Sequence, residues 1–237
     1  MTGTLYCVGV GPGDPELMTL KGLACIRRCP VIAVPKSGGS AGRAKQILLA
    51  ALEEQDIDIS AKTMVDISFP MTRSAVVLEK AHASGAAAIE EYLNAGQDAA
   101  LITLGCPTVY ASSIYIHRLV RRHGYDTAII PGVPSFCAAA ARLQQPLCEQ
   151  DEPLTIIPGN RKDRLELLSQ PGNAVIMKPS GSLDALKEDL QKAGVLDTTS
   201  LIERCGLPEE QVFPNAAEAE DSPYFSILLV RKEEETE

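Results

Sequence analysis

The hydrophobic pattern in the first half of the chain alternates between two periods. Apolar runs rich in β-branched residues predict buried strands over residues 5–10, 31–34, 64–69, 98–104 and 126–130. The amphipathic or Ala-rich stretches between them predict helices over residues 17–29, 44–54, 75–95, 112–123 and 135–143. Regular alternation of strand and helix predicts a mainly parallel sheet with helices on both faces.

A charged segment over residues 148–153 interrupts this pattern and predicts a linker. The pattern then resumes, with strands expected over residues 154–157, 174–177, 199–203 and 225–230 and helices over residues 164–169 and 183–192. We therefore expect an α/β protein of two domains, residues 1–148 and 149–237. Each domain should have a β-sheet core flanked by helices, and the acidic segment 233–237 should be frayed.

Amino-acid composition and net charge argue for a globular protein and against a nucleic-acid-binding or membrane protein. The chain has 237 residues, of which 45% are hydrophobic and none is Trp, so we expect a large core of Ala, Val, Leu and Ile. The net charge of −9 argues against nucleic-acid binding. The chain shows no signal peptide and no run of ~20 apolar residues that could span a membrane, so a soluble cytoplasmic protein is expected.

Charge is unevenly distributed, because the first 45 residues carry six basic and two acidic side chains in an otherwise acidic protein. A basic patch of this kind suits a polyanionic small molecule. Residues 36–42 predict a flexible polar loop whose glycines would permit closure over a ligand. Lys36, Arg43 and Lys45 lie in it or beside it, and we expect these three side chains to bind substrate. A solvated helix face beside an ordinary loop explains each single residue equally well.

The seven cysteines favour neither disulfides nor a metal site. Cys25 and Cys29 would share a helical face, but Ile32 stands where a third thiolate of a cluster would be needed. We therefore expect buried free thiols and no bound metal.

The turn after the first predicted strand is glycine-rich like a nucleotide-binding loop, but it does not match the known nucleotide-binding sequence patterns. Gly9 and Gly11 begin the dinucleotide pattern G-x-G-x-x-G, whereas Asp14 replaces its third glycine. Pro12 and Pro15 have no backbone N–H to offer a phosphate. The P-loop pattern is absent too, which leaves a structural turn or a different ligand.

Glycine-proline turns follow three predicted strands, at residues 11–13, 104–107 and 131–136. Ligands of open α/β sheets bind beyond the carboxyl ends of the strands. Three such turns in one domain therefore suggest the backbone-lined walls of one pocket.

These segments carry a family resemblance over essentially the whole chain. The chain resembles the tetrapyrrole (corrin and porphyrin) methyltransferases, whose two-domain fold differs from the Rossmann methyltransferases. The resemblance rests on VGVGPGDPELMTLKG (8–22), ITLGCPTVYASS (102–113), IIPGVPSFCAAAA (129–141), VIMKPSG (175–181) and ERCGLPEEQVF (203–213). Within the family, SFPM (68–71) and YFSILLV (224–230) resemble the precorrin-2 / cobalt-factor II C20-methyltransferases of cobalamin synthesis.

The resemblance implies S-adenosylmethionine-dependent methylation of C20 by a homodimer, with the first domain on the substrate side of the cofactor and the second completing the cofactor site. It implies cofactor contacts from Pro12, Leu104, Gly105, Cys106, Val109, Pro134, Ser135, Met177, Cys205 and Gly206. Many family members have Asp where this chain has Cys106, so an acidic role at that position must be filled in another way.

Methyl transfer from a sulfonium mainly requires alignment of the nucleophile with the methyl group. A proton must also leave C20 in some substrate forms, and Asp14, Glu16 and Tyr110 are candidate acceptors. A helix-capping carboxylate or a core phenol explains each of them as well.

Other functions stay open at this point. The chain could methylate another position of a related tetrapyrrole, or a different substrate such as a protein histidine or an rRNA ribose. It could also be a tetrapyrrole- or cofactor-binding protein without activity. Whether the substrate carries cobalt is not decided by the sequence.

Overall fold

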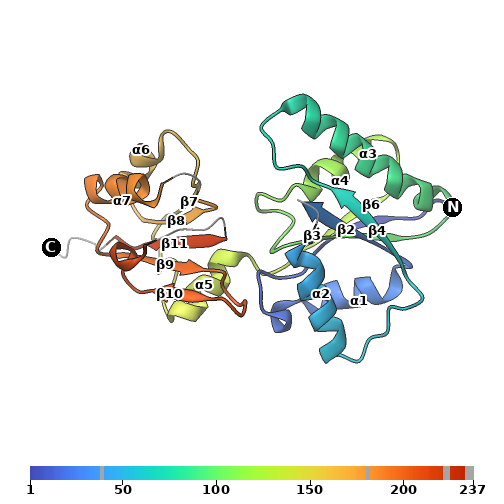
Figure 1. The fold of residues 1–237 in the computed structure, drawn as a ribbon, viewed down its shortest axis with the longest axis horizontal. Coiled ribbons are helices and arrows are strands. Elements are labelled where there is room, and N and C mark those ends of the chain that lie inside the picture. The colour runs from blue at the N-terminus through green and yellow to red at the C-terminus, as the bar shows by residue number, and fades with distance from the viewer. Residues whose placement is uncertain (38–39, 180–181, 221–224, 233–237) are drawn as a thin grey trace. The chain divides into compact units, whose positions relative to one another are not determined.

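The computed structural model describes residues 1–237 except 38–39, 180–181, 221–224 and 233–237, and it divides the chain into two compact units. Unit 1 is Met1–Pro134 and unit 2 is Ser135–Glu237, and each is described by itself (Figure 1). The division precedes α5 (Ser135–Leu143) and so differs from the expected boundary between residues 148 and 149. The reason is that α5 contacts β11 (Ser226–Val230) of unit 2.

The sheet of unit 1 has five parallel strands, as the alternating pattern predicts. In spatial order they are β4 (Thr63–Ser68), β2 (Val31–Ser37), β5 (Ala99–Thr103), β1 (Leu5–Gly9) and β6 (Thr127–Ile130). A sixth strand, β3 (Ser40–Ala41), pairs antiparallel with the end of β2. The expectation of a loop over residues 36–42 was therefore wrong in part, because Lys36 and Ser37 continue β2. Gly38 and Gly39 lie outside the described residues.

Helices cover both faces of this sheet. The helices α1 (Leu20–Arg28) and α2 (Arg43–Glu54) lie on one face, and α3 (Ala75–Asn94) and α4 (Ser113–Arg122) on the other (Figure 1). The period of two in β1 separates the two cores, since Leu5 and Cys7 pack with α3 and α4 whereas Val8 and Val10 pack with α1 and α2. Both cores are built from aliphatic side chains, as the composition predicts.

Unit 2 has a mixed sheet, which the local pattern did not indicate. Its order is β10 (Gln211–Phe213), β9 (Thr199–Glu203), β11, β8 (Asn173–Met177) and β7 (Leu154–Pro158). Here β7 pairs parallel with β8, whereas the other neighbours pair antiparallel. The helices α6 (Arg164–Leu168) and α7 (Leu183–Lys192) contribute to an aliphatic core with β7, β8, β9 and β11. The short strand β10 was missing from the expected elements.

Two short 3₁₀ helices complete the described elements, η1 (Pro15–Leu17) in unit 1 and η2 (Ala216–Glu218) in unit 2. Within the described ranges, no helix combines the length and the apolar character needed to cross a membrane.

Candidate functional site

Three glycine-proline turns meet at one edge of the unit 1 sheet. Strands β5, β1 and β6 are parallel neighbours, so their carboxyl ends share that edge. The N–H of Gly105 donates to the carbonyl of Gly11 at 2.8 Å, and the N–H of Val10 donates to the carbonyl of Thr103 at 3.0 Å. The three segments Gly9–Gly13, Leu104–Cys106 and Pro131–Val133 therefore form one unit, which we call the strand-end cluster.

The strand-end cluster is packed too tightly for side chains at its centre. A Cβ atom on Gly9 would lie 2.4 Å from the carbonyl oxygen of Gly105 and 2.6 Å from the nitrogen of Gly132. A Cβ atom on Gly132 would lie 2.3 Å from the same Gly105 oxygen. Gly9 and Gly132 are therefore required by contact between backbones.

Thr19 ties the first turn to the third, a link that the sequence pattern did not reveal. Its Oγ1 donates to the carbonyl of Pro131 at 3.4 Å and accepts from the N–H of Gly22 at 3.1 Å. The latter bond caps α1. One hydroxyl therefore fixes the start of a helix and the end of β6 together.

Asp14 lies at the N-cap of η1, and its side chain accepts from the N–H of Glu16 at 2.9 Å. This is the capping role that the sequence allows as an alternative to proton transfer. Glu16 itself is exposed.

Cys106 is a buried thiol surrounded by donors. Its Sγ lies 3.0 Å from Oγ1 of Thr108. Burial raises the pKa of Cys106, but hydrogen bonds from the Thr108 hydroxyl and from the backbone N–H groups of Thr108 and Gly132 outweigh it and lower the pKa below its usual value. The Thr two residues after Cys106 is the one feature of the sequence that could have indicated such a bond.

Among the described residues of the segments that carry the family resemblance, three non-glycine residues adopt left-handed backbone conformations. Tyr110 has φ +46°, Lys178 has φ +52° and Arg204 has φ +50°. Burial also lowers the pKa of Lys178. Strained backbone of this kind concentrates at functional sites, which is consistent with functional roles for these segments.

The expected cofactor residues divide between the two units. Pro12, Leu104, Gly105, Cys106 and Val109 belong to the strand-end cluster or follow it directly, and Pro134 closes unit 1. In unit 2, Ser135 begins α5, Met177 ends β8 and Cys205 and Gly206 follow β9. Strand β11 pairs Ile227 with Met177 and Ser226 with Glu203. Met177 and Cys205 therefore lie at the same edge of the unit 2 sheet, and both are buried.

The expected substrate cations also lie at the carboxyl edge of unit 1. Lys36 is near the end of β2, and Arg43 and Lys45 are in the first turn of α2, which follows. The Nζ of Lys36 forms an exposed ion pair with Asp66 at 3.1 Å.

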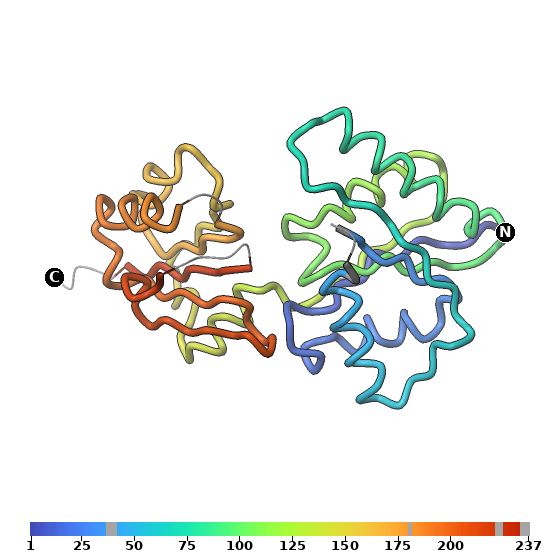
Figure 2. Tube along the Cα trace, in the orientation of Figure 1, coloured from blue at the N-terminus to red at the C-terminus, as the bar shows by residue number. Residues whose placement is uncertain are grey.

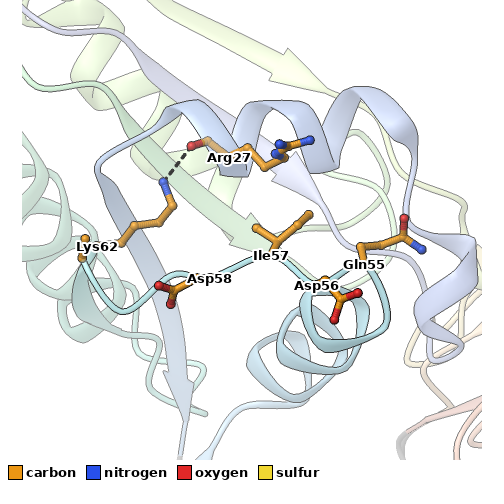
Figure 3. Close-up of a pocket in the computed structure, with 7 residues that line it drawn as sticks. Arg27, Gln55, Asp56, Ile57, Asp58 and Lys62 are labelled. Carbon is orange, nitrogen blue, oxygen red and sulfur yellow. Dashed lines mark hydrogen bonds between the residues drawn. The ribbon is translucent and has the colours of Figure 1, made fainter.

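A pocket of about 300 Å³ lies at the opposite edge of unit 1, where β2 and β4 begin (Figure 3). It lies between the end of α1 and the segment before β4, and it is lined by Arg27, Gln55, Asp56, Ile57, Asp58, Ala61 and Lys62. The Nζ of Lys62 donates to the carbonyls of Arg27 and Cys29, both at 2.8 Å, and so closes the end of α1. None of the expected site residues lines this pocket, and we assign it to the packing of the fold.

Cys25 and Cys29 are buried free thiols, as expected, and their Sγ atoms lie 3.9 Å apart. In the part of the chain that the structure describes, His, Cys, Asp and Glu form no group of three or more that could hold a metal ion.

The sequence matches known proteins over most of its length. The CobIJ cobalamin biosynthesis protein of Mycobacterium tuberculosis is 31% identical over 96% of this chain, which spans 46% of that protein. The chain thus covers about half the length of this relative. The cobalt-precorrin-2 C(20)-methyltransferase of Salmonella typhimurium is 30% identical, with 98% of each chain covered.

A solved structure shows the same fold. It is the uroporphyrin-III C-methyltransferase of Thermus thermophilus in complex with S-adenosyl homocysteine, with a TM-score of 0.68 and 20% identity over 97% of this chain and 98% of that one. The family model of the tetrapyrrole (corrin/porphyrin) methylases matches residues 4–220. The chain therefore belongs to the tetrapyrrole methylase family.

Proposed function

We propose that this protein transfers a methyl group from S-adenosylmethionine to C20 of precorrin-2 or of its cobalt form. The observation that supports the proposal is the strand-end cluster, in which three turns meet backbone to backbone at the carboxyl edge of the unit 1 sheet, in a chain that aligns over 98% of its length with a C20-methyltransferase. Residues 68–71, which resemble that branch of the family, lie at the same edge, because Ser68 ends β4 and the others follow it.

The residues of the strand-end cluster fit the methyl donor. Because Gly9 and Gly132 lack side chains, the three turns approach one another closely, and peptide groups beside them could offer donors and acceptors to a compact ligand with amino and carboxylate groups. The residues that we propose to bind it are Pro12, Leu104, Gly105, Cys106, Val109, Pro134, Ser135, Met177, Cys205 and Gly206. The donor supplies an activated methyl group, and its S-adenosyl homocysteine product was present in the fold relative from Thermus thermophilus.

The protein would speed the reaction mainly by aligning the attacking carbon with the methyl group. Holding the attacking carbon in line with the methyl group can lower the barrier by up to ~7–11 kcal/mol. The rigid backbone contacts of the strand-end cluster support such positioning. Lys36, Arg43 and Lys45 would bind the substrate carboxylates, because cations at an exposed edge attract polyanions.

Asp14 and Tyr110 are our candidates for accepting the proton that leaves C20. Asp14 is half-buried beside the first glycine turn, and Tyr110 is half-exposed with a strained backbone. Either group would need to approach the substrate carbon within hydrogen-bond reach, directly or through one water.

The deciding experiment is an incubation of the purified protein with S-adenosylmethionine and either precorrin-2 or cobalt-precorrin-2. We expect the mass of the tetrapyrrole to increase by one methyl group, and ¹³C NMR with labelled donor to place that group at C20. A methyl group at another carbon would contradict the C20 assignment and support a different tetrapyrrole methylase. Comparing the two substrates decides whether the natural one carries cobalt.

A non-catalytic binding protein is the second candidate, because Cys106 stands where many family members have Asp. Tight binding of S-adenosylmethionine without methylation of any reduced tetrapyrrole would favour it.

We further propose a cytoplasmic homodimer that binds no nucleic acid and needs no protein-bound metal. The net charge of −9 supports the absence of nucleic-acid binding. Light scattering coupled to gel filtration would test the dimer, and a monomeric mass at micromolar concentration would contradict it.

A further inference from the structure

A second part of the unit 1 carboxyl edge has the properties of a ligand surface. Strand β4 ends there at Ser68, and the chain then runs to the start of α3 (Figure 2). The N–H of Phe69 donates to the carbonyl of Lys36 at 2.9 Å, which anchors this segment to the end of β2. The segment therefore lies beside one of the expected substrate cations.

Apolar side chains are exposed in this region. Met71 is 76% exposed, Val76 62% and Val77 45%. The fully buried residues of α3, which are Gly85, Ala86, Ile89 and Leu93, all lie in its second half. Clustered exposed apolar side chains on a soluble domain mark an interaction site more often than scattered ones do.

The first turn of α3, which carries Val76 and Val77, lies at the carboxyl edge of the sheet. Because α3 follows the parallel strand β4, its first residue lies at the carboxyl edge of the sheet. Side chains of an α-helix tilt toward its N-terminus, so Val76 and Val77 in the first turn lean toward this edge.

A stack of aromatic rings supports the same region. The ring of Phe69 lies 6.1 Å from that of His82 at an angle of 55°, and the His82 ring stacks on Tyr115 at 4.9 Å and 14°. Tyr115 in the first turn of α4 is 50% exposed. The stack connects the segment after β4 with His82, two turns into α3, and with the first turn of α4, and so it fixes these elements against one another.

Two exposed cations belong to the same part of the edge. Arg73 lies in the segment between β4 and α3, and Lys36 is in β2, whose carbonyl at this residue accepts from Phe69; the positive end of the α3 dipole adds to their charge. Asp66 pairs with Lys36, and Glu79 is the nearest acidic residue along α3. A ligand with a broad apolar face and carboxylates at its rim complements this arrangement, whereas a purely anionic ligand would leave the apolar side chains in water.

We infer that Met71, Val76, Val77 and Tyr115, flanked by Lys36 and Arg73, form the surface that binds the face and rim of the tetrapyrrole; we call it the α3 platform. This inference rests on the proposed function and assigns its substrate recognition to particular residues. The competing occupant of such a surface is a second copy of the chain.

The test compares the double variant Val76→Ser/Val77→Ser with the wild type by titration of cobalt-precorrin-2. We expect the dissociation constant to rise about tenfold or more, because two apolar contacts are lost. The affinity for S-adenosyl homocysteine, measured by calorimetry, and the mass in light scattering should not change. Leu49→Ser is the matched control, since Leu49 is also an exposed aliphatic residue on a helix, 42% exposed, but belongs to α2.

The outcomes separate the possibilities. Unchanged tetrapyrrole affinity in the double variant overturns the α3 platform, and a halved mass together with unchanged affinity identifies the surface as the contact between copies. If the wild-type protein binds S-adenosyl homocysteine but no tetrapyrrole, both the proposed function and the α3 platform are wrong. Arg73→Gln, which leaves the apolar side chains intact, should lower the affinity and weaken its dependence on salt.

Discussion

Gly11 and Gly105 form an antiparallel bridge between two turns that leave parallel strands, with the Gly105 N–H donating to the Gly11 carbonyl at 2.8 Å. Both residues have positive φ, +82° and +68°. The bridge extends the pairing of β1 and β5 beyond the strands themselves, and so it holds two of the three glycine-proline turns in one rigid arrangement.

Replacing Gly132 by Ala should disrupt the strand-end cluster. The new Cβ would lie 2.3 Å from the Gly105 oxygen, so backbone must move, and we expect a loss of about 1–3 kcal/mol in the free energy of unfolding. Affinity for S-adenosylmethionine should fall as well. Gly124→Ala is the control, because it has positive φ but nothing within 4 Å of the added carbon and should retain full affinity. Equal affinities for the two variants would contradict a role of the cluster in cofactor binding.

Thr108→Val should raise the pKa of the Cys106 thiol, because the valine cannot donate a hydrogen bond to Sγ. The pKa in the folded protein is lowered, so ionised Cys106 stabilises the fold above the thiol's unfolded pKa. This contribution is lost as the pH falls through the lower, folded pKa. Alkylation rates against pH, followed at the Cys106 peptide by mass spectrometry, should show a higher midpoint in the variant.

Cys7 is the internal control for this measurement. Burial raises the pKa of Cys7 to about 12, so its peptide should stay unlabelled at neutral pH in both proteins. An unchanged midpoint for Cys106 in Thr108→Val would refute the assigned cause of the lowered pKa.

Arg43→Ala should weaken tetrapyrrole binding and leave S-adenosyl homocysteine binding intact. Loss of one cation at the carboxyl edge should raise the dissociation constant about tenfold, or about 1.4 kcal/mol. Titration with cobalt-precorrin-2 measures the effect. Lys192→Ala serves as the control, since Lys192 is an exposed cation at the end of α7 in unit 2. Superimposable titration curves for Arg43→Ala and the wild type would show that Arg43 does not bind the substrate.

Asp14→Asn separates the capping role of Asp14 from proton transfer. The amide oxygen of Asn can still accept from the Glu16 N–H, so we expect an unchanged melting temperature. If the carboxylate accepts the C20 proton, single-turnover methylation should slow by about 10²-fold or more. An unchanged rate would assign Asp14 to capping alone and leave Tyr110, tested by Tyr110→Phe, as the candidate.

Arg164→Met should destabilise unit 2. The Arg164 guanidinium donates to the Gly159 carbonyl at 2.7 Å and pairs with Asp189, and its side chain is only 12% exposed. Removing it leaves a largely desolvated carboxylate and carbonyl without their donor, for which we expect a loss of about 2 kcal/mol. Arg161→Met, which breaks the exposed pair with Asp163, should change stability by less than about 0.5 kcal/mol. Denaturant unfolding of both variants checks the contrast.

The sequence by itself determined most local structure and the family. Strands, helices and turns followed from period, β-branching and glycine-proline pairs, because these features act within a few residues of the chain. The helix over residues 135–143 and the strand over residues 199–203 were predicted to the residue. Asp14, in place of a third glycine after Gly9 and Gly11, argues against a dinucleotide loop together with Pro12 and Pro15.

Tertiary structure decided what depends on partners distant in sequence. Only the order β5-β1-β6 shows that the three turns meet, and only the fold brings Thr19 to Pro131. The antiparallel pairing of unit 2 and the hydrogen bond from Gly132 to Cys106 arise in the same way. The physical reason is that local periodicity fixes which face of an element is buried, whereas pairing and packing across the fold fix which elements become neighbours.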